Sequence, residues 1–494
     1  MKFQTSKEGP LAVASKMLVQ GCFEGEIPFG GQKVNNRIKL EGFTGKLGEH
    51  FIHFNDVAKA TRLLVVGLGP RDKFDVKALR KVLTTVLKLV KDNKLDEVTF
   101  APKVGEVDIV GAETFGENLA TYAGLVDYVI NHQKTARGKH KSEIRLQTVT
   151  VLVDDATDAG VTAGLAKGQA IGEAVNFARD LSNMPAGQLT PNRLAAFAQA
   201  VARKSGGTIT CRLLRGAQLR RIGAHALLAV AQGSTQPPVL IDLTYTPKTG
   251  ATDDVLGFVG KSITFDSGGL DLKTADGMRT MKRDMAGGAS VLAALSAIAK
   301  LELPVSVRVV MAATENMPDG DSYKPGDVLK TMAGLTVEVD NTDAEGRLTL
   351  ADGIEYIKRQ NASKVIDLAT LTGAQRSISS DVGAAGFGNN DEFSGLVAAA
   401  AKSAGERVMF VEMWEEFRDG NKTDMADLKN SGGDPGSVTA AWFLREFAGE
   451  KTPWVHLDIA GPSFRSRELG PDPKGSTGFG VRLLVELARL SVKK

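Results

Sequence analysis

Residues 255–284 read VLGFVGKSITFDSGGLDLKTADGMRTMKRD, and the start of this stretch decides the fold class. Val255–Val259 is a short apolar run typical of a buried strand. Comparable runs occupy 239–244, 305–312 and 365–368, and segments with helical periodicity alternate with them at 287–300 and 350–359. This alternation predicts a parallel or mixed sheet covered by helices, whose active site lies in the loops at the carboxyl ends of the strands.

Towards the N-terminus the same kind of pattern repeats on a smaller scale. Apolar runs at 63–69 (LLVVGLG) and 149–153 (VTVLV) flank a helical pattern at 76–94. A further helical pattern, 165–181, is broken by Pro185, Gly187 and Pro191. We therefore predict a smaller N-terminal α/β domain in 1–164, a linker helix in 165–184, and a larger α/β domain in 185–494.

Composition narrows the class of protein. The 494 residues are 43% hydrophobic and 24% charged, which is typical of a soluble globular protein. The formal net charge of +3 neither requires nor rules out a nucleic acid partner. Two cysteines without CxxC spacing, Cys22 and Cys211, argue against disulfides and indicate a reducing compartment. The sequence shows no signal peptide and no membrane-spanning run, so we expect a cytoplasmic protein.

Histidine is missing from the part of the sequence that is richest in motifs. None of the six histidines lies between His225 and His456, which excludes an HExxH metal site there and disfavours a Ser-His-Asp triad. Chemistry in that span must rely on carboxylates, lysines, arginines and metal ions.

Two groups of charged residues fill the span. The first follows the strand at 255–259 and comprises Lys261, Asp266, Lys273 and Asp284. The second lies in 340–348 (DNTDAEGRL), where Asp343, Glu345 and Arg347 are spaced by two and would share one face of an extended segment. Carboxylates gathered after apolar strands repel one another unless cations lie among them, so the combination favours a metal cluster.

Each group also has a simpler interpretation. An isolated DxE is more often solvated surface, TFDSGG could be a tight turn, and Lys273 could be an ordinary surface lysine. The tripeptide Gly260–Ser262 ends like a phosphate-binding P-loop, but Val255 stands where that motif needs glycine. The residues after Ser262 also lack helical character, so we reject a nucleotide-binding loop.

At these residues the chain resembles the leucine aminopeptidase family of dinuclear metallopeptidases. The family signature NTDAEGRL is intact at 341–348, and the segments GKSITFDSGG (260–269), YKPGDVL (323–329) and DLATLTGA (367–374) also match. The resemblance implies a small macro-like N-terminal α/β domain and a catalytic α/β domain with a mixed central sheet. It also implies a metal-dependent aminopeptidase that releases N-terminal leucine and other apolar residues from peptides.

The resemblance further implies a ligand set for two divalent ions, Mn²⁺ or Zn²⁺. In that set Asp266 and Glu345 bridge the ions, Asp343 completes one site, and Lys261 and Asp284 complete the other. Lys261 is unusual because an amine ligates a metal only when it is neutral. Without the resemblance, an ion pair between Lys261 and a carboxylate would be the preferred interpretation.

Catalytic and substrate-binding roles are implied in the same way. A water or hydroxide shared by the metals attacks the peptide carbonyl, Lys273 stabilises the oxyanion, and Arg347 holds a bicarbonate that shuttles the proton. Met281 and Thr370 lie near the pocket for the first side chain, and Leu371 contacts the substrate backbone. Met281 on its own is more often a core residue.

The family also assembles as a homohexamer, which we expect here, with peptides as substrates and no membrane partner. One alternative is a nucleic-acid-binding role for the basic stretches 212–221 and 134–145, although neither has interleaved aromatic residues. Another is a related hydrolase that cleaves cysteinylglycine.

Overall fold

The computed structural model describes residues 1–26, 36, 42–54, 59–102, 104–130, 144–249 and 254–492. The chain divides into two compact α/β units, one of Met1–Asn176 with Glu468–Pro473 and one of Phe177–Arg467 with Lys474–Lys494. Helix α5 (Asp158–Asn183) carries the chain from the first unit to the second. The two-domain α/β architecture expected from the sequence is confirmed. The boundaries at 164 and 184 stay a prediction.

The first unit is built on a six-stranded sheet in the order β1-β6-β5-β2-β4-β3. All neighbouring strands are parallel except the edge pair β3 and β4. The strands are β1 (Lys2–Ser6), β2 (Leu18–Phe23), β3 (His50–Phe54), β4 (Arg62–Gly69), β5 (Glu97–Phe100) and β6 (Thr148–Leu152). Most of the expected basic stretch 134–145 lies outside the described residues.

Among the residues described, three further helices belong to this unit: α2 (Val76–Asp92), α3 (Val104–Val110) and α4 (Ala112–Val126). Helix α2 begins where the Asp75 side chain accepts a hydrogen bond from the Ala78 N–H at 2.8 Å. Its buried residues recur every three or four positions, which places one apolar face of the helix in the core with α4.

The second unit contains a mixed sheet of nine strands, in the order β16-β15-β18-β14-β9-β11-β8-β7, with β10 paired to β11. The four central strands β18, β14, β9 and β11 run parallel. The strands are β7 (Ile209–Leu214), β8 (Val239–Tyr245), β9 (Val255–Gly260), β10 (Ser262–Asp266), β11 (Ser306–Asn316), β14 (Lys364–Ala369), β15 (Ala384–Gly388), β16 (Val408–Phe410) and β18 (Trp454–Asp458). All four strands predicted in this region from the sequence are confirmed.

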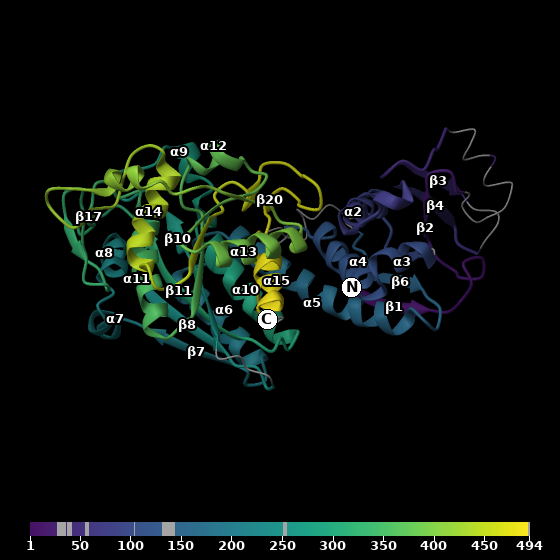
Figure 1. Ribbon diagram of the computed structural model, residues 1–494, viewed down its shortest axis with the longest axis horizontal. Helices are drawn as coiled ribbons and strands as arrows, with labels where there is room; N and C mark the ends of the chain where they lie inside the picture. The colour runs from purple at the N-terminus through teal and green to yellow at the C-terminus, as the bar shows by residue number, and fades with distance from the viewer. Residues whose placement is uncertain are drawn as a thin grey trace. The chain divides into compact units, whose positions relative to one another are not determined.

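Helices cover both faces of this sheet (Figure 1). One face packs against α8 (His225–Val230), α11 (Glu345–Arg359) and α14 (Gly436–Ala448). The other packs against α10 (Ala286–Lys300), α13 (Asp391–Ala404) and α15 (Val481–Val492). Helix α10 lies close to β9, since a Cβ on Gly260 would come within 2.6 Å of the Gly288 Cα.

The remaining described elements are short, except α6 (Pro191–Lys204), which packs against β7 and β8 of the nine-stranded sheet. They are α6 (Pro191–Lys204), α7 (Ala217–Ile222), α9 (Ala275–Met278), α12 (Gln375–Ser379), the strands β12 (Val328–Lys330), β13 (Thr336–Glu338), β17 (Leu428–Lys429), β19 (Phe464–Arg465) and β20 (Gly475–Ser476), and the 3-10 turns η1 (Arg71–Lys73), η2 (Ala231–Gly233), η3 (Met281–Arg283) and η4 (Glu415–Asn421). Strands β12, β13 and β17 form a separate three-stranded sheet.

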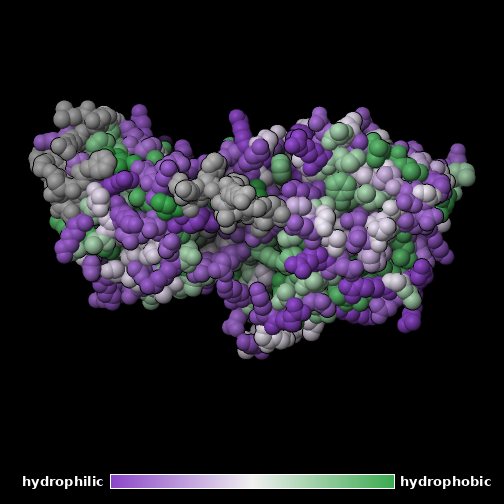
Figure 2. Space-filling view, turned by 180° about the vertical axis from the view of Figure 1, so that it is seen from behind, coloured by the Kyte–Doolittle hydropathy of each residue, from purple (hydrophilic) through white to green (hydrophobic). Residues whose placement is uncertain are grey.

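The surface is mixed in character. On the face in Figure 2, hydrophobic residues are scattered among hydrophilic ones. Among the residues described, none of the helices combines the length and the apolar character that crossing a membrane requires.

Candidate active site

The candidate site lies at the carboxyl ends of the central strands. Lys261 directly follows β9, Asp266 is the last residue of β10, and Thr370 directly follows β14. Because these strands belong to the same sheet, the residues after them meet at one edge. The side chain of Lys261 is buried, and its Nζ donates to the Thr370 carbonyl at 3.0 Å.

A glycine turn follows Asp266 and closes the loop around it. Gly268 and Gly269 have φ values of 91° and 69°, which favour glycine over residues with a side chain. A Cβ on Gly269 would come within 2.9 Å of the Asn316 amide oxygen. The Gly268 N–H donates to Asp266 Oδ1 at 2.8 Å, so the turn fixes this carboxylate directly.

Asp284 and Glu345 reach Lys261 from two different helical segments. Asp284 follows η3 and is buried, and Glu345 is the first residue of α11. Lys261 Nζ lies 2.8 Å from Asp284 Oδ2 and 2.8 Å from Glu345 Oε1. The Thr370 hydroxyl donates to the other Asp284 oxygen at 2.8 Å.

The expected geometry of the second motif was wrong in one respect. Asp343, Glu345 and Arg347 do not share the face of an extended segment, because α11 begins at Glu345. Asp343 remains in the loop before the helix, where the Asn341 side chain accepts a hydrogen bond from its backbone N–H at 2.7 Å. The change from loop to helix, rather than strand alternation, brings the two carboxylates to one place.

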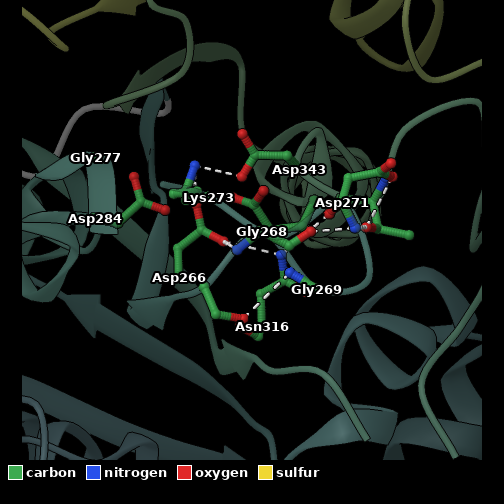
Figure 3. Close-up of polar contacts among 12 residues, drawn as sticks. Asp266, Gly268, Gly269, Asp271, Lys273, Gly277, Asp284, Asn316 and Asp343 are labelled. Carbon is green, nitrogen blue, oxygen red and sulfur yellow. Dashed lines mark hydrogen bonds and ion pairs between the residues drawn. The ribbon is translucent and has the colours of Figure 1, made fainter. Parts of the chain in front are cut away.

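The carboxylates converge. One oxygen from each of Asp266, Asp343 and Glu345 lies within 4.8 Å of the others, a spacing that suits a shared cation. Lys273 Nζ lies 2.9 Å from Asp266 Oδ2 and also contacts Asp343. Figure 3 shows Asp266, Asp284 and Asp343 directed towards the space around the Lys273 amine.

The electrostatics of this cluster are dominated by burial and by neighbouring charges. Burial raises the pKa of Asp284 well above its ordinary value, against the pull of Lys261. Burial and the charges of Asp266 and Glu345 raise the pKa of Asp343 to about 6, with Lys273 opposing them. Asp284 and Asp343 therefore hold protons more tightly than usual, and bound cations would relieve the repulsion between the carboxylates.

The pKa values of the two lysines are also raised, but by neighbouring carboxylates rather than by burial. Burial alone would lower the pKa of Lys261, but Asp284 and the other carboxylates around it outweigh burial and hold the pKa above its ordinary value. The pKa of Lys273 is raised for the same reason, chiefly by Asp266. A divalent cation beside Lys261 would reverse this balance, because it repels the ammonium form and favours the neutral amine.

An unsatisfied oxygen tests whether the residues fit a metal. Glu345 is 1% exposed, and its Oε2 has no hydrogen-bond partner. A buried carboxylate oxygen without a partner is costly, whereas a hard cation or zinc accepts it as a ligand. The donor set therefore fits divalent metal ions.

Arg347 lies in the first turn of α11 and is 8% exposed. Its Nη1 donates to the Asn430 carbonyl at 2.5 Å, while its buried Nε has no hydrogen-bond partner. Burial lowers the pKa of its guanidinium to about 10, so the group remains a cation at neutral pH. A guanidinium with a buried N–H that has no hydrogen-bond partner can bind a small anion.

Three residues were expected at the substrate pocket, and only one of them contacts a carboxylate of the cluster directly. Thr370 is joined to the cluster through Asp284, and the neighbouring Leu371 is half-buried, with its N–H donating to Asp458 Oδ1 at 3.2 Å. Met281 is half-buried at the start of η3, three residues before Asp284.

Several supporting residues were missed by the sequence analysis. Asn316, the last residue of β11, donates to Asp266 Oδ1 at 2.9 Å and to the Thr342 carbonyl at 3.0 Å. The Thr342 backbone N–H donates to Asp271 Oδ2 at 2.7 Å. Asn316 was missed because its strand was expected to end at residue 312, whereas β11 continues to Asn316.

Comparisons with known proteins agree with this arrangement. Residues 176–485 match the model of the cytosol aminopeptidase family catalytic domain, and residues 28–137 match that family's N-terminal domain. Probable cytosol aminopeptidases of Alkaliphilus metalliredigens and Roseiflexus castenholzii are 37% and 38% identical to the chain, each match covering 99% of both sequences.

Two solved structures are similar over nearly the whole chain. The bottromycin maturation enzyme BotP in complex with Mn has a TM-score of 0.86 at 32% identity and covers 97% of this chain and 100% of its own. A mutant of tomato leucine aminopeptidase has a TM-score of 0.86 at 29% identity and covers 99% of this chain and 96% of its own.

The fold, the carboxylate cluster and these relatives define the class of protein as a metal-dependent peptidase. The chain belongs to the cytosol aminopeptidase family. It is accordingly a hydrolase, a metallo-aminopeptidase that acts on peptides.

Proposed function

We propose that the chain is a leucyl aminopeptidase that uses two divalent ions to release N-terminal leucine and other apolar residues from peptides. The proposal rests on the convergence of Asp266, Asp343 and Glu345, whose carboxylate oxygens lie within 4.8 Å of one another. Lys261 lies beside them and contacts both Asp284 and Glu345.

The five residues divide between two ions. Asp266 and Glu345 would bridge the pair, Asp343 would complete one site, and Lys261 with Asp284 would complete the other. The unpartnered Glu345 Oε2 and the contact of Lys261 with both Asp284 and Glu345 support this division. Oxygen and nitrogen ligands suit Mn²⁺ or Zn²⁺, and BotP has been solved with Mn. When bound, such a pair lowers the pKa of a shared water and stabilises a tetrahedral intermediate.

The chain's own cations would act on the substrate and on the proton. Lys273 is held by Asp266 and Asp343 and remains protonated, so it can donate a hydrogen bond to the oxyanion that develops on the peptide carbonyl. Arg347 would hold a bicarbonate through its free Nε, and the bicarbonate would accept the proton from the attacking water.

The proposed substrate preference follows from the residues near Asp284. Met281 and Thr370 would line the pocket for the first side chain and Leu371 would contact the substrate backbone, an arrangement suited to apolar residues. Met281 flanks Asp284 in sequence, and Thr370 contacts it.

We also propose a cellular location and an oligomeric state for the enzyme. Cys22 and Cys211 form no disulfide, which agrees with a cytoplasmic protein. Large apolar side chains exposed on the second unit support assembly to a homohexamer: Met409 at 52%, Trp414 at 57% and Met425 at 68%.

The experiment compares three substrates at one Mn²⁺ concentration: leucyl p-nitroanilide, its N-acetylated form and cysteinylglycine. We expect rapid hydrolysis of the first and none of the second, because an exopeptidase of this kind requires a free amine. Faster turnover of cysteinylglycine than of any leucyl substrate would favour the dipeptidase alternative.

A further inference from the structure

Asn430 lies beside the loop that carries Asp343. It follows β17, whose parallel pairing with β13 aligns Lys429 with Glu338. The Asn430 side chain is completely buried, and the backbone N–H of this residue donates to the Glu338 carbonyl at 3.0 Å. The adjoining loop, residues 340–344, leads from β13 to the first residue of α11.

The Asn430 amide uses its whole hydrogen-bonding capacity on this loop. Oδ1 accepts from the N–H groups of Asp340 at 2.8 Å and Asn341 at 3.1 Å. Nδ2 donates to the carbonyls of Asn341 at 2.7 Å and Ala344 at 3.4 Å. Because the Asn341 side chain accepts from the Asp343 N–H, the chain of contacts ends on the candidate metal ligand.

The backbone of Asn430 makes a second connection. Its carbonyl oxygen accepts from Arg347 Nη1, and the buried Nε of that guanidinium has no hydrogen-bond partner. One residue, 83 positions from Arg347 in sequence, thus holds the loop of a metal ligand and the cation proposed to bind an anion.

We propose that Asn430 is a positioning residue of the active site, which fixes Asp343 and Arg347 relative to each other. The proposal rests on the proposed function, because it assumes that these two residues serve one reaction. Asparagine is required because two donors and two acceptors are needed at one point. Aspartate would set a carboxylate against two carbonyls, and serine is too short to reach both sides of the loop.

The test is Asn430→Asp, with Mn²⁺ binding measured by calorimetry alongside hydrolysis of leucyl p-nitroanilide. Residues that orient metal ligands typically cost about 10–100-fold in affinity or activity when replaced. We expect the Mn²⁺ dissociation constant to rise and kcat to fall within that range, and part of the rate to return at saturating Mn²⁺. Because saturating metal also stabilises a folded state, thermal unfolding of the metal-free variant is measured in parallel, and an unfolding temperature equal to that of the metal-free original chain excludes a general folding defect.

Asn421→Asp is the matched control. Asn421 is 1% exposed and lies in the same part of the chain, but its Nδ2 donates only to the Lys429 carbonyl, at 3.3 Å. This variant also buries a carboxylate against a carbonyl, so we expect it to lose stability but to keep Mn²⁺ affinity and kcat within about twofold of the original chain. If Asn430→Asp does not fold, Asn430→Ser is compared in the same way.

The outcomes separate the two proposals. An active original chain, together with a folded Asn430 variant that binds Mn²⁺ and turns over equally well, would overturn the positioning role alone. If the original chain hydrolysed no peptide but bound Mn²⁺ more tightly than the variant, the proposed function would fall and the positioning role would stand.

Discussion

Lys261 determines how the site responds to pH. The carboxylates hold the pKa of Lys261 above its ordinary value, so its amine is protonated throughout the neutral range. Only the neutral amine can ligate a metal, and binding through Lys261 must therefore displace a proton. Asp343, with its pKa raised to about 6, must also be deprotonated. Both requirements act in the same direction, since metal binding strengthens as pH rises.

We expect Mn²⁺ affinity to increase about tenfold per pH unit above about pH 6, and more steeply below it, where Asp343 also takes up a proton. Calorimetry in buffers of different ionisation enthalpy measures the protons released, and we expect at least one per chain near neutral pH, from Lys261, with Asp284 adding to it where it is still protonated. A Lys261→Gln variant should lose the dependence above pH 6. No proton release by the original chain would contradict ligation by Lys261.

Individual site residues could be predicted from the sequence only because short motifs carry them. The Asp343, Glu345 and Arg347 spacing lies within eight residues and was visible, although the geometry inferred from it was wrong. Asn430 was not visible, because its partners Asp340–Ala344 are nearly 90 residues away and no local pattern marks it. Contacts of this kind depend on the pairing of β13 with β17, which periodicity does not reveal.

At the scale of elements, the start of α11 matters most. The strands were predictable because buried parallel strands appear as continuous apolar runs. The beginning of α11 was expected near residue 350 and lies at Glu345. Ala344 provides no side-chain cap, and the first turn lacks the usual apolar spacing, so the sequence contains no conventional start signal there.

The first turn of α11 has no space for a side chain at residue 346. A Cβ on Gly346 would overlap the Lys261 side chain, including Nζ. We expect Gly346→Ala to displace that amine and lower kcat/KM for leucyl p-nitroanilide more than about tenfold, although alanine favours a helix by about 1 kcal/mol over glycine. Steady-state kinetics and thermal unfolding check this.

Gly395→Ala is the control in another helix, α13. No atom lies within 4 Å of the position its Cβ would occupy. We expect unchanged kinetics and a stability equal to or slightly above that of the original chain. Equal kinetics for both variants would argue against the close packing of Gly346 on Lys261.

At the scale of the whole molecule, the sequence suggests an oligomeric state, the homohexamer, only through its resemblance to the family. Exposed apolar residues such as Trp414 and Met425 cost free energy when they remain in water. Sedimentation velocity at micromolar concentration should give a particle of about six times the chain mass. A monomer under those conditions would contradict the homohexamer.

The claim on which the account depends is that the clustered carboxylates bind a pair of divalent ions that the reaction requires. The most direct measurement removes metal by chelation and then follows leucyl p-nitroanilide hydrolysis and bound Mn²⁺ together as Mn²⁺ is restored. We expect activity to disappear and to return as occupancy approaches two ions per chain, while Glu345→Ala, still folded, loses more than about 100-fold in kcat/KM. Full activity in a preparation that contains no bound metal would contradict the account.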